Sequence, residues 1–218
     1  MDQPKLFVYH PTSHEQSLTM KRLSRMQWIL ISGAAIIAAY TGFAYTQSKK
    51  LDRPSYEVVK RDGSFEIRDY GERLWAEVSV SQAEYSTMSR EGFRPLARYI
   101  FGGNQSQTSM AMTAPVSLIM EQTDPRMRFF MSDKGRAADL PKPLQEGIRF
   151  IEEPAQRYAV LSYGGLLSQE RNMEYGQKLK TWCDAEGLEI EGPLEVYGYN
   201  APYEVIRHNE VAYPIARR

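Results

Sequence analysis

The chain has 218 residues, of which 42% are hydrophobic, and this is enough to bury one sizeable core with a short appendage. Its 27 Lys and Arg residues balance its 27 Asp and Glu residues, so it has no basic field with which to hold a nucleic-acid backbone. Its single cysteine, Cys183, excludes an internal disulfide and has no Cys or His at the spacing of a zinc site.

The N-terminal part of the chain divides by composition into three segments. Residues 1–25 contain Pro, Ser and Thr without sustained periodicity, which predicts a flexible tail. Residues 26–48 carry no charge, and a helix of that length, rising about 1.5 Å per residue, spans the ~30 Å hydrocarbon layer of a membrane. Residues 49–54 are polar and end in a proline, which predicts a short stalk.

We interpret residues 26–48 as a single-pass transmembrane anchor, with the lipid bilayer as a partner. Trp28 and Tyr45 fit interfacial aromatic anchors, and basic residues flank both ends, so the sequence does not set the orientation in the membrane. A cleaved signal peptide is the alternative, although the leader before the apolar run would be unusually long. A buried core helix fits less well, because a helix that is apolar on every face needs a much larger protein around it.

Residues 55–218 are expected to form one domain in which a pattern occurs twice. Residues 65–80 and 149–163 each predict a strand, a polar turn and a second strand, with an aromatic-Ala pair in matching places. A helix follows each: one over residues 82–101, interrupted near Gly92 and Pro95, and one from an N-cap at Ser168 to a C-cap at Gly187. Further strands are expected at residues 116–120, 126–131, 194–199 and from about 205 to the chain end.

Two strand-helix-strand units related by pseudo-symmetry predict a curved sheet with one helix on each half, because each amphipathic helix must bury its apolar stripe against a sheet. The expected fold class is α+β. We expect a distorted antiparallel β-barrel with two main helices, preceded by the single transmembrane helix.

The most particular motif is GFRPLARYIFGGNQSQTSMAMTAPV, residues 92–116, in which a short helix runs into a glycine turn, a polar loop and a strand opening. Together with FEIRDYG from residue 65 and RHNEV from residue 207, it resembles the signature of the SOUL/heme-binding-protein family. The resemblance extends from about residue 56 to residue 211. It implies a distorted barrel with two helices, similar to the effector-binding domains of multidrug-responsive regulators, and non-covalent binding of heme or another tetrapyrrole.

The candidate binding residues lie on the first helix. A heme needs a flat apolar wall for its ring and cations near its propionates. Phe93, Leu96 and Ala97 lie on neighbouring faces of this helix, and Arg90 and Arg98 can supply the cations. The proposed heme-contacting helix of the family aligns with the same five residues. The alternative is that the apolar residues are ordinary core and the two arginines a solvated face.

No axial iron ligand is expected. A histidine proposed as axial ligand in one branch of the family is replaced here by Asp69. His208, the only histidine after the apolar segment, is a weaker candidate, because with Arg207, Asn209 and Glu210 it better fits a structural cluster that ties the last strand to the barrel. The resemblance therefore implies a porphyrin held by apolar contact and propionate pairing.

The sequence does not predict an enzyme. It lacks a nucleophile elbow, a phosphate-binding glycine loop and a His-Glu-x-x-His motif, and Glu66, Glu77 and Glu210 are the residual candidates for acid-base chemistry. The first hypothesis is a membrane-anchored protein that buffers or delivers heme or a related porphyrin, with an unidentified donor or acceptor protein. The second is a non-catalytic binding or scaffold module of the same fold that recognises a protein or another amphipathic small molecule.

Overall fold

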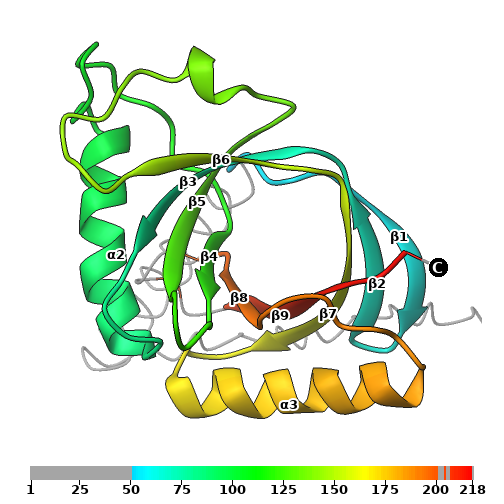
Figure 1. Cartoon of the computed structure of the whole chain (residues 1–218). Coiled ribbons are helices and arrows are strands. Elements are labelled where there is room, and N and C mark those ends of the chain that lie inside the picture. Colours follow the sequence, from blue (N-terminus) through cyan, green and yellow to red (C-terminus); the bar gives the residue numbers. More distant parts are fainter. Residues whose placement is uncertain (1–50, 201–203, 205–206, 218) are drawn as a thin grey trace, which may run out of the picture. The chain divides into compact units, whose positions relative to one another are not determined.

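The computed structural model describes residues 51–200, 204 and 207–217 (Figure 1). The predicted tail, residues 1–25, and the predicted transmembrane segment, residues 26–48, lie outside this part of the chain. Within the described ranges, no helix combines the length and the apolar character needed to cross a membrane. Asp52, in the predicted stalk, forms a β-bridge with Thr113, and its carbonyl accepts a hydrogen bond from the Ala114 N–H at 2.9 Å.

The described residues form nine strands, two α-helices and one short 3₁₀ turn. The first five strands and the first helix are β1 (Tyr56–Asp62), β2 (Phe65–Tyr70), β3 (Arg73–Ser79), α2 (Tyr85–Ile100), β4 (Val116–Ile119) and β5 (Arg126–Asp133). After the turn η1 (Ala137–Asp139) come β6 (Arg149–Glu153), β7 (Gln156–Gly164), α3 (Gln169–Ala185), β8 (Glu195–Gly198) and β9 (His208–Ile215).

The strands pair antiparallel in one sheet, in the order β1-β2-β7-β9-β8-β4-β5-β3-β6. The sheet curls strongly, with both helices on its outer side (Figure 1). It is not closed, because β1 and β6 remain as its edges among the described strands. The α+β class and the large antiparallel sheet are confirmed, but the sheet does not close into the distorted β-barrel that was predicted. The physical reason is that β6 and β7, although joined by a two-residue turn, pair with different neighbours: β6 with β3, and β7 with β2 and β9.

The two halves of the chain contribute equivalent elements to the sheet. The first half contributes β2, β3, α2, β4 and β5, and the second contributes β6, β7, α3, β8 and β9, with β4 and β8 paired where the halves meet. The first strand of each half pairs with the second strand of the other half, β2 with β7 and β6 with β3. The two predicted strand-helix-strand units therefore interlock through exchanged first strands.

Each helix packs on equivalent strands, α2 on β3 and β5 and α3 on β7 and β9. The helix α2 is continuous, so the predicted interruption near Gly92 and Pro95 is wrong. Gly92 is needed for close approach to the sheet, since a Cβ at that position would lie 2.6 Å from the Cβ of Met127. The Ser168 N-cap of α3 is confirmed by the hydrogen bond that its Oγ accepts from the Arg171 N–H, and Gly187 follows the helix with a φ of +66°.

Candidate functional site

The five predicted site residues lie on α2 but do not share one pocket. Leu96 is fully buried in the core and Ala97 is half-buried. Phe93 is 38% exposed, and Arg90 and Arg98 are exposed on the outer side of the helix. The side chain of Leu96 is enclosed by its own protein, as the interpretation as ordinary core expects.

A pocket of about 220 Å³ opens beside Phe93, where α2 meets the seam between the two halves of the sheet. We call it the Phe93 pocket. The ring of Phe93 packs edge-on against Phe129 with 5.4 Å between centroids. The pocket is lined by side chains from α2, from the neighbouring strands and from the segments around α3 and β9: Tyr85, Ser89, Phe93, Val116, Leu118, Met127, Leu167, Gly198, Asn200 and Arg207.

Polar groups also line the Phe93 pocket. Arg207 brings a guanidinium to the pocket, and its Nε donates a hydrogen bond to the carbonyl of Glu204 at 3.0 Å. Burial raises the pKa of Tyr85, against the opposite effect of the Arg207 charge, so the Tyr85 hydroxyl stays neutral at physiological pH. The N–H of Tyr85 donates to the Gln169 side chain at 3.0 Å and so ties the start of α2 to the start of α3.

Sequence reasoning found one residue of this pocket, Phe93, and missed the others. Tyr85 and Ser89 precede Phe93 at helical spacings of eight and four, which is a signal for one continuous helix face. With an interruption predicted near Gly92, the three residues could not be assigned to one helix face. Arg207 is distant in sequence, and only the pairing of β8 with β9 and β4 brings its loop to α2.

The size of the Phe93 pocket limits what it can do. Pockets that enclose a drug-sized ligand measure roughly 300–1,000 Å³. At about 220 Å³, this pocket can hold one side of a larger flat molecule and leaves the rest open to solvent. Its apolar wall and the guanidinium of Arg207 suit an amphipathic planar ligand that carries an acidic group.

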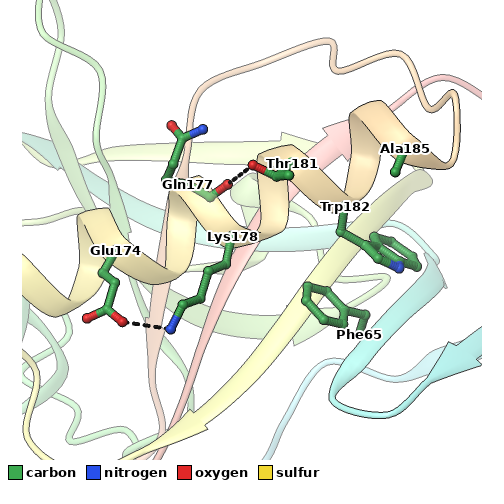
Figure 2. A pocket seen from close by; sticks show the side chains of 7 residues that line it. All are labelled: Phe65, Glu174, Gln177, Lys178, Thr181, Trp182 and Ala185. Carbon is green, nitrogen blue, oxygen red and sulfur yellow. Dashed lines mark hydrogen bonds and ion pairs between the residues drawn. The ribbon is translucent and has the colours of Figure 1, made fainter.

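A second hollow, of about 600 Å³, lies on the surface of α3 (Figure 2). We call it the α3 hollow. Phe65 and Trp182 stack on each other at one end, with 5.1 Å between ring centroids and 16° between planes. Lys178 is turned toward Glu174 and forms an ion pair with it at 2.6 Å (Figure 2). The polar rim of the α3 hollow therefore includes an ion pair formed within α3 itself.

The three glutamates considered for acid-base chemistry are buried in ion pairs. Glu66 and Glu210 both contact Arg68, at 2.6 and 2.9 Å, and Glu77 contacts Arg149 at 2.9 Å. Burial would raise the pKa of Glu210, but hydrogen bonds from His208 and Arg68 hold it at about 2. Such a carboxylate is a poor general base at neutral pH. This agrees with the prediction that Glu210 ties the last strand to the sheet.

His208, the weaker candidate for an iron ligand, already contacts an acidic side chain. The Nε2 of His208 lies 3.0 Å from Glu210, and Asp69, at the position of the histidine of one branch of the family, forms an ion pair with Arg157 at 2.8 Å. Cys183 is buried, and desolvation raises the pKa of its thiol to about 11. In the part of the chain that the structure describes, no group of three or more His, Cys, Asp or Glu side chains could hold a metal ion.

The curved antiparallel sheet, its two outer helices and the Phe93 pocket define an α+β domain with an apolar binding surface. Residues 51–214 match the sequence profile of the SOUL heme-binding protein family, and the chain therefore belongs to that family. It is 30% identical to human heme-binding protein 2 over 161 residues, which cover 68% of this chain and 77% of that protein. It is 27% identical to heme-binding protein 2 of Mus musculus over 180 residues, which cover 76% and 87% of the two chains.

The fold also resembles that of the EcmrR C-terminal domain. The TM-score is 0.53 at 12% sequence identity, and the match covers 75% of this chain and 99% of that domain. This likeness concerns the fold alone.

Proposed function

We propose that this protein binds heme or another tetrapyrrole non-covalently at the Phe93 pocket. Membership of the SOUL heme-binding protein family supports the ligand class. The observation that carries the location is the apolar pocket between the two halves of the sheet, bordered by Phe93 and Arg207. Human and mouse relatives are named for binding heme, and their names describe a ligand rather than a reaction.

The residues present fit one face of a porphyrin. Phe93, Leu118, Met127 and Leu167 provide an apolar wall for the ring, and Arg207 provides a cation for a propionate. We assign this charge to Arg207 because it lines the pocket, whereas Arg90 and Arg98 do not. None of the lining residues is a histidine or a cysteine, so the proposal needs no bond to iron, and metal-free protoporphyrin is expected to bind as well.

The same proposal includes the single-pass anchor at residues 26–48, which the uncharged composition of that segment supports. A tether would hold the domain near the bilayer into which porphyrins partition. The protein would then buffer a porphyrin there or deliver it to an acceptor protein.

A titration of the full chain in lipid nanodiscs with hemin, and separately with iron-free protoporphyrin, tests the ligand. We expect saturable binding to both after subtraction of the signal from empty discs. Phe93→Ser and Arg207→Gln are each expected to weaken binding about tenfold, since each removes one side of the contact, equivalent to roughly 1.4 kcal/mol. Phe65→Ser, in the α3 hollow, is the matched control and is expected to leave the affinity unchanged.

Two results would contradict the proposal. Non-saturating adsorption of both compounds would favour the second hypothesis, a scaffold module for a protein or another amphipathic ligand. Saturable binding that Phe65→Ser weakens and Phe93→Ser does not would move the site to α3. Circular dichroism of each variant separates loss of binding from loss of fold.

A further inference from the structure

Three arginines form a stripe along the outer side of α2. Arg90, Arg94 and Arg98 are spaced four residues apart and therefore lie on one side of the helix, and all three are exposed. The salt bridges among the described residues involve other arginines. Like charges at this spacing destabilise a helix. The positive charge of Arg98, in the last turn, interacts favourably with the negative end of the helix dipole. Arg90 and Arg94 lie too far from that end to gain the same stabilisation.

Large apolar side chains lie among these arginines. At about 100° per residue, Phe101 falls between Arg90 and Arg94 around the helix axis, and Phe93 falls beside Arg90. Phe101 is 61% exposed and Phe93 is 38% exposed. Leu144, which is 65% exposed, is held at the same end of α2 by a hydrogen bond from its N–H to the carbonyl of Gly103, which follows the helix.

The three arginine side chains of α2 are exposed, whereas the buried residues of the helix are directed to the core, where α2 packs on β3 and β5. The loop after the helix packs on the stem of Arg98, since a Cβ at Gly103 would lie 2.8 Å from the Arg98 Cγ.

Glu91, the acidic residue of this helix, accepts hydrogen bonds from the N–H and hydroxyl of Ser81 at 3.0 and 2.8 Å. These bonds, and to a smaller extent the charge of Arg90, lower the pKa of Glu91, so its carboxylate offsets part of one of the three positive charges. Lys142 is exposed, and its carbonyl accepts a hydrogen bond from the N–H of Gln105, which follows α2. The surface is therefore positive, with protruding apolar tips.

We propose that this surface, the arginine face (Arg90, Arg94, Arg98, Phe93, Phe101 and Leu144), docks onto an anionic membrane surface. Arginines beside an anionic leaflet strengthen partitioning by roughly fivefold each, so three contribute on the order of 100-fold. Isolated apolar side chains between cations are typical of surfaces that enter the headgroup layer. The alternative partner, an acidic protein surface, would use the charges but would leave the exposed tips of Phe101 and Leu144 without an apolar environment.

The inference is independent of porphyrin binding and of the anchor at residues 26–48. Phe93 belongs to both the arginine face and the Phe93 pocket. Docking through α2 would therefore place the mouth of the pocket next to the bilayer.

The test uses the full chain with a polarity-sensitive fluorophore at Phe101→Cys. Met173→Cys, on α3 and 51% exposed, is the control position, and unsubstituted protein controls for labelling of the buried Cys183. The full chain is incorporated into nanodiscs of phosphatidylcholine alone or with added phosphatidylserine, so that residues 26–48 have the same bilayer environment in both samples. We expect a blue shift and quenching by lipid-bound nitroxides at position 101, only with phosphatidylserine and weaker at high salt. A probe at 173 should show neither.

Charge substitutions then test the arginines. Arg90→Gln combined with Arg94→Gln and Arg98→Gln is expected to require roughly 100-fold more anionic lipid for the same shift. Lys60→Gln combined with Lys178→Gln and Lys180→Gln makes the same change in net charge elsewhere and should leave the shift unchanged. A triple arginine variant that behaves as the original chain overturns the proposal, as does a probe at 101 that stays in water. Saturable binding of polyglutamate at this face without lipid contact would assign it to an acidic protein and would equally overturn the proposal.

Discussion

At the scale of single residues, Glu210 shows how burial and charge together set the character of the last strand. Its carboxylate accepts hydrogen bonds from Arg68 at 2.9 and 3.0 Å, from Tyr199 at 2.7 Å and from Ser162 at 3.2 Å. Desolvation raises the pKa of Tyr199 well above its ordinary value, so that hydroxyl remains a donor. The cluster joins β2, β7 and β9, which are adjacent in the sheet.

This cluster predicts a loss of stability in acid. The pKa of Glu210 in the folded protein is about 2, below the value of about 4.3 for an unfolded glutamate. The ionised group therefore stabilises the native state above the unfolded pKa, and this contribution disappears as pH falls toward 2. We expect the free energy of unfolding, measured by urea denaturation at successive pH values, to fall steadily from about pH 5 to pH 2.

Glu210→Gln isolates this contribution. It leaves the buried guanidinium of Arg68 with one acidic partner, Glu66, instead of two, and breaking a buried ion pair costs about 3–5 kcal/mol. We expect the substitution to lower the free energy of unfolding at neutral pH by an amount near the lower end of this range. We also expect the free energy of unfolding to depend less steeply on pH than in the original chain. Glu174→Gln, which removes an exposed ion pair with Lys178, is the control and should change neither quantity measurably. An unchanged pH profile in Glu210→Gln would show that the cluster does not carry the acid sensitivity.

At the scale of elements, the boundaries that short sequence motifs determine could be predicted from the sequence. The sequence predicts a strand over residues 116–120, and β4 occurs at Val116–Ile119, directly after Pro115. The Ser168 cap marks the start of α3 in the same way. The continuity of α2 could not be predicted from local signals. A glycine is needed at position 92 because of the close contact with Met127 on β5, so its low helix propensity does not mark a helix end.

The contact between Gly92 and Met127 gives a test with a definite sign. In an exposed helix, Gly→Ala stabilises by about 1 kcal/mol. Gly92→Ala would instead place a Cβ 2.6 Å from the Met127 Cβ and 2.9 Å from its sulfur, and such overpacking costs about 1–3 kcal/mol. We expect a lower melting temperature, measured by circular dichroism. Gly176→Ala, in α3, is the comparison, because its close neighbours are the methyl groups at the end of the Leu194 side chain rather than a Cβ, and a change of side-chain rotamer can move them, so it should cost less. A stabilised Gly92→Ala protein would show that α2 can move away from β5.

The same division between local and distant contacts holds for the candidate site. Phe93 could be found from the helix pattern and the family motif. Tyr85 could be assigned to the same helix face as Phe93 only with α2 as one continuous helix. Arg207 reaches the pocket only through the pairing of β8 with β9. The sequence also placed Arg90 and Arg98 on the helix correctly but could not say that they face away from the pocket.

At the scale of the whole molecule, the exchanged strands make the two halves of the sheet mutually dependent. β2 pairs with β7 along residues 65–70, and β3 pairs with β6 along residues 73–77, so each half completes the sheet of the other. Sequence similarity between the halves predicted two repeats, but it could not show which strands pair, because pairing is decided between segments about 90 residues apart.

This interlocking predicts that neither half folds alone. Gly147 lies in the exposed connection before β6, with a φ of +90° and open space around its Cα, so a cut there removes few contacts of its own. A fragment of residues 1–147 leaves β2 without β7 and β3 without β6, and a fragment of residues 148–218 lacks the same partners. We expect neither fragment to show a cooperative thermal transition by circular dichroism, and we expect an equimolar mixture to recover one. A cooperative transition in the isolated 1–147 fragment would show that the first half is an independent folding unit and that the exchanged strands are dispensable.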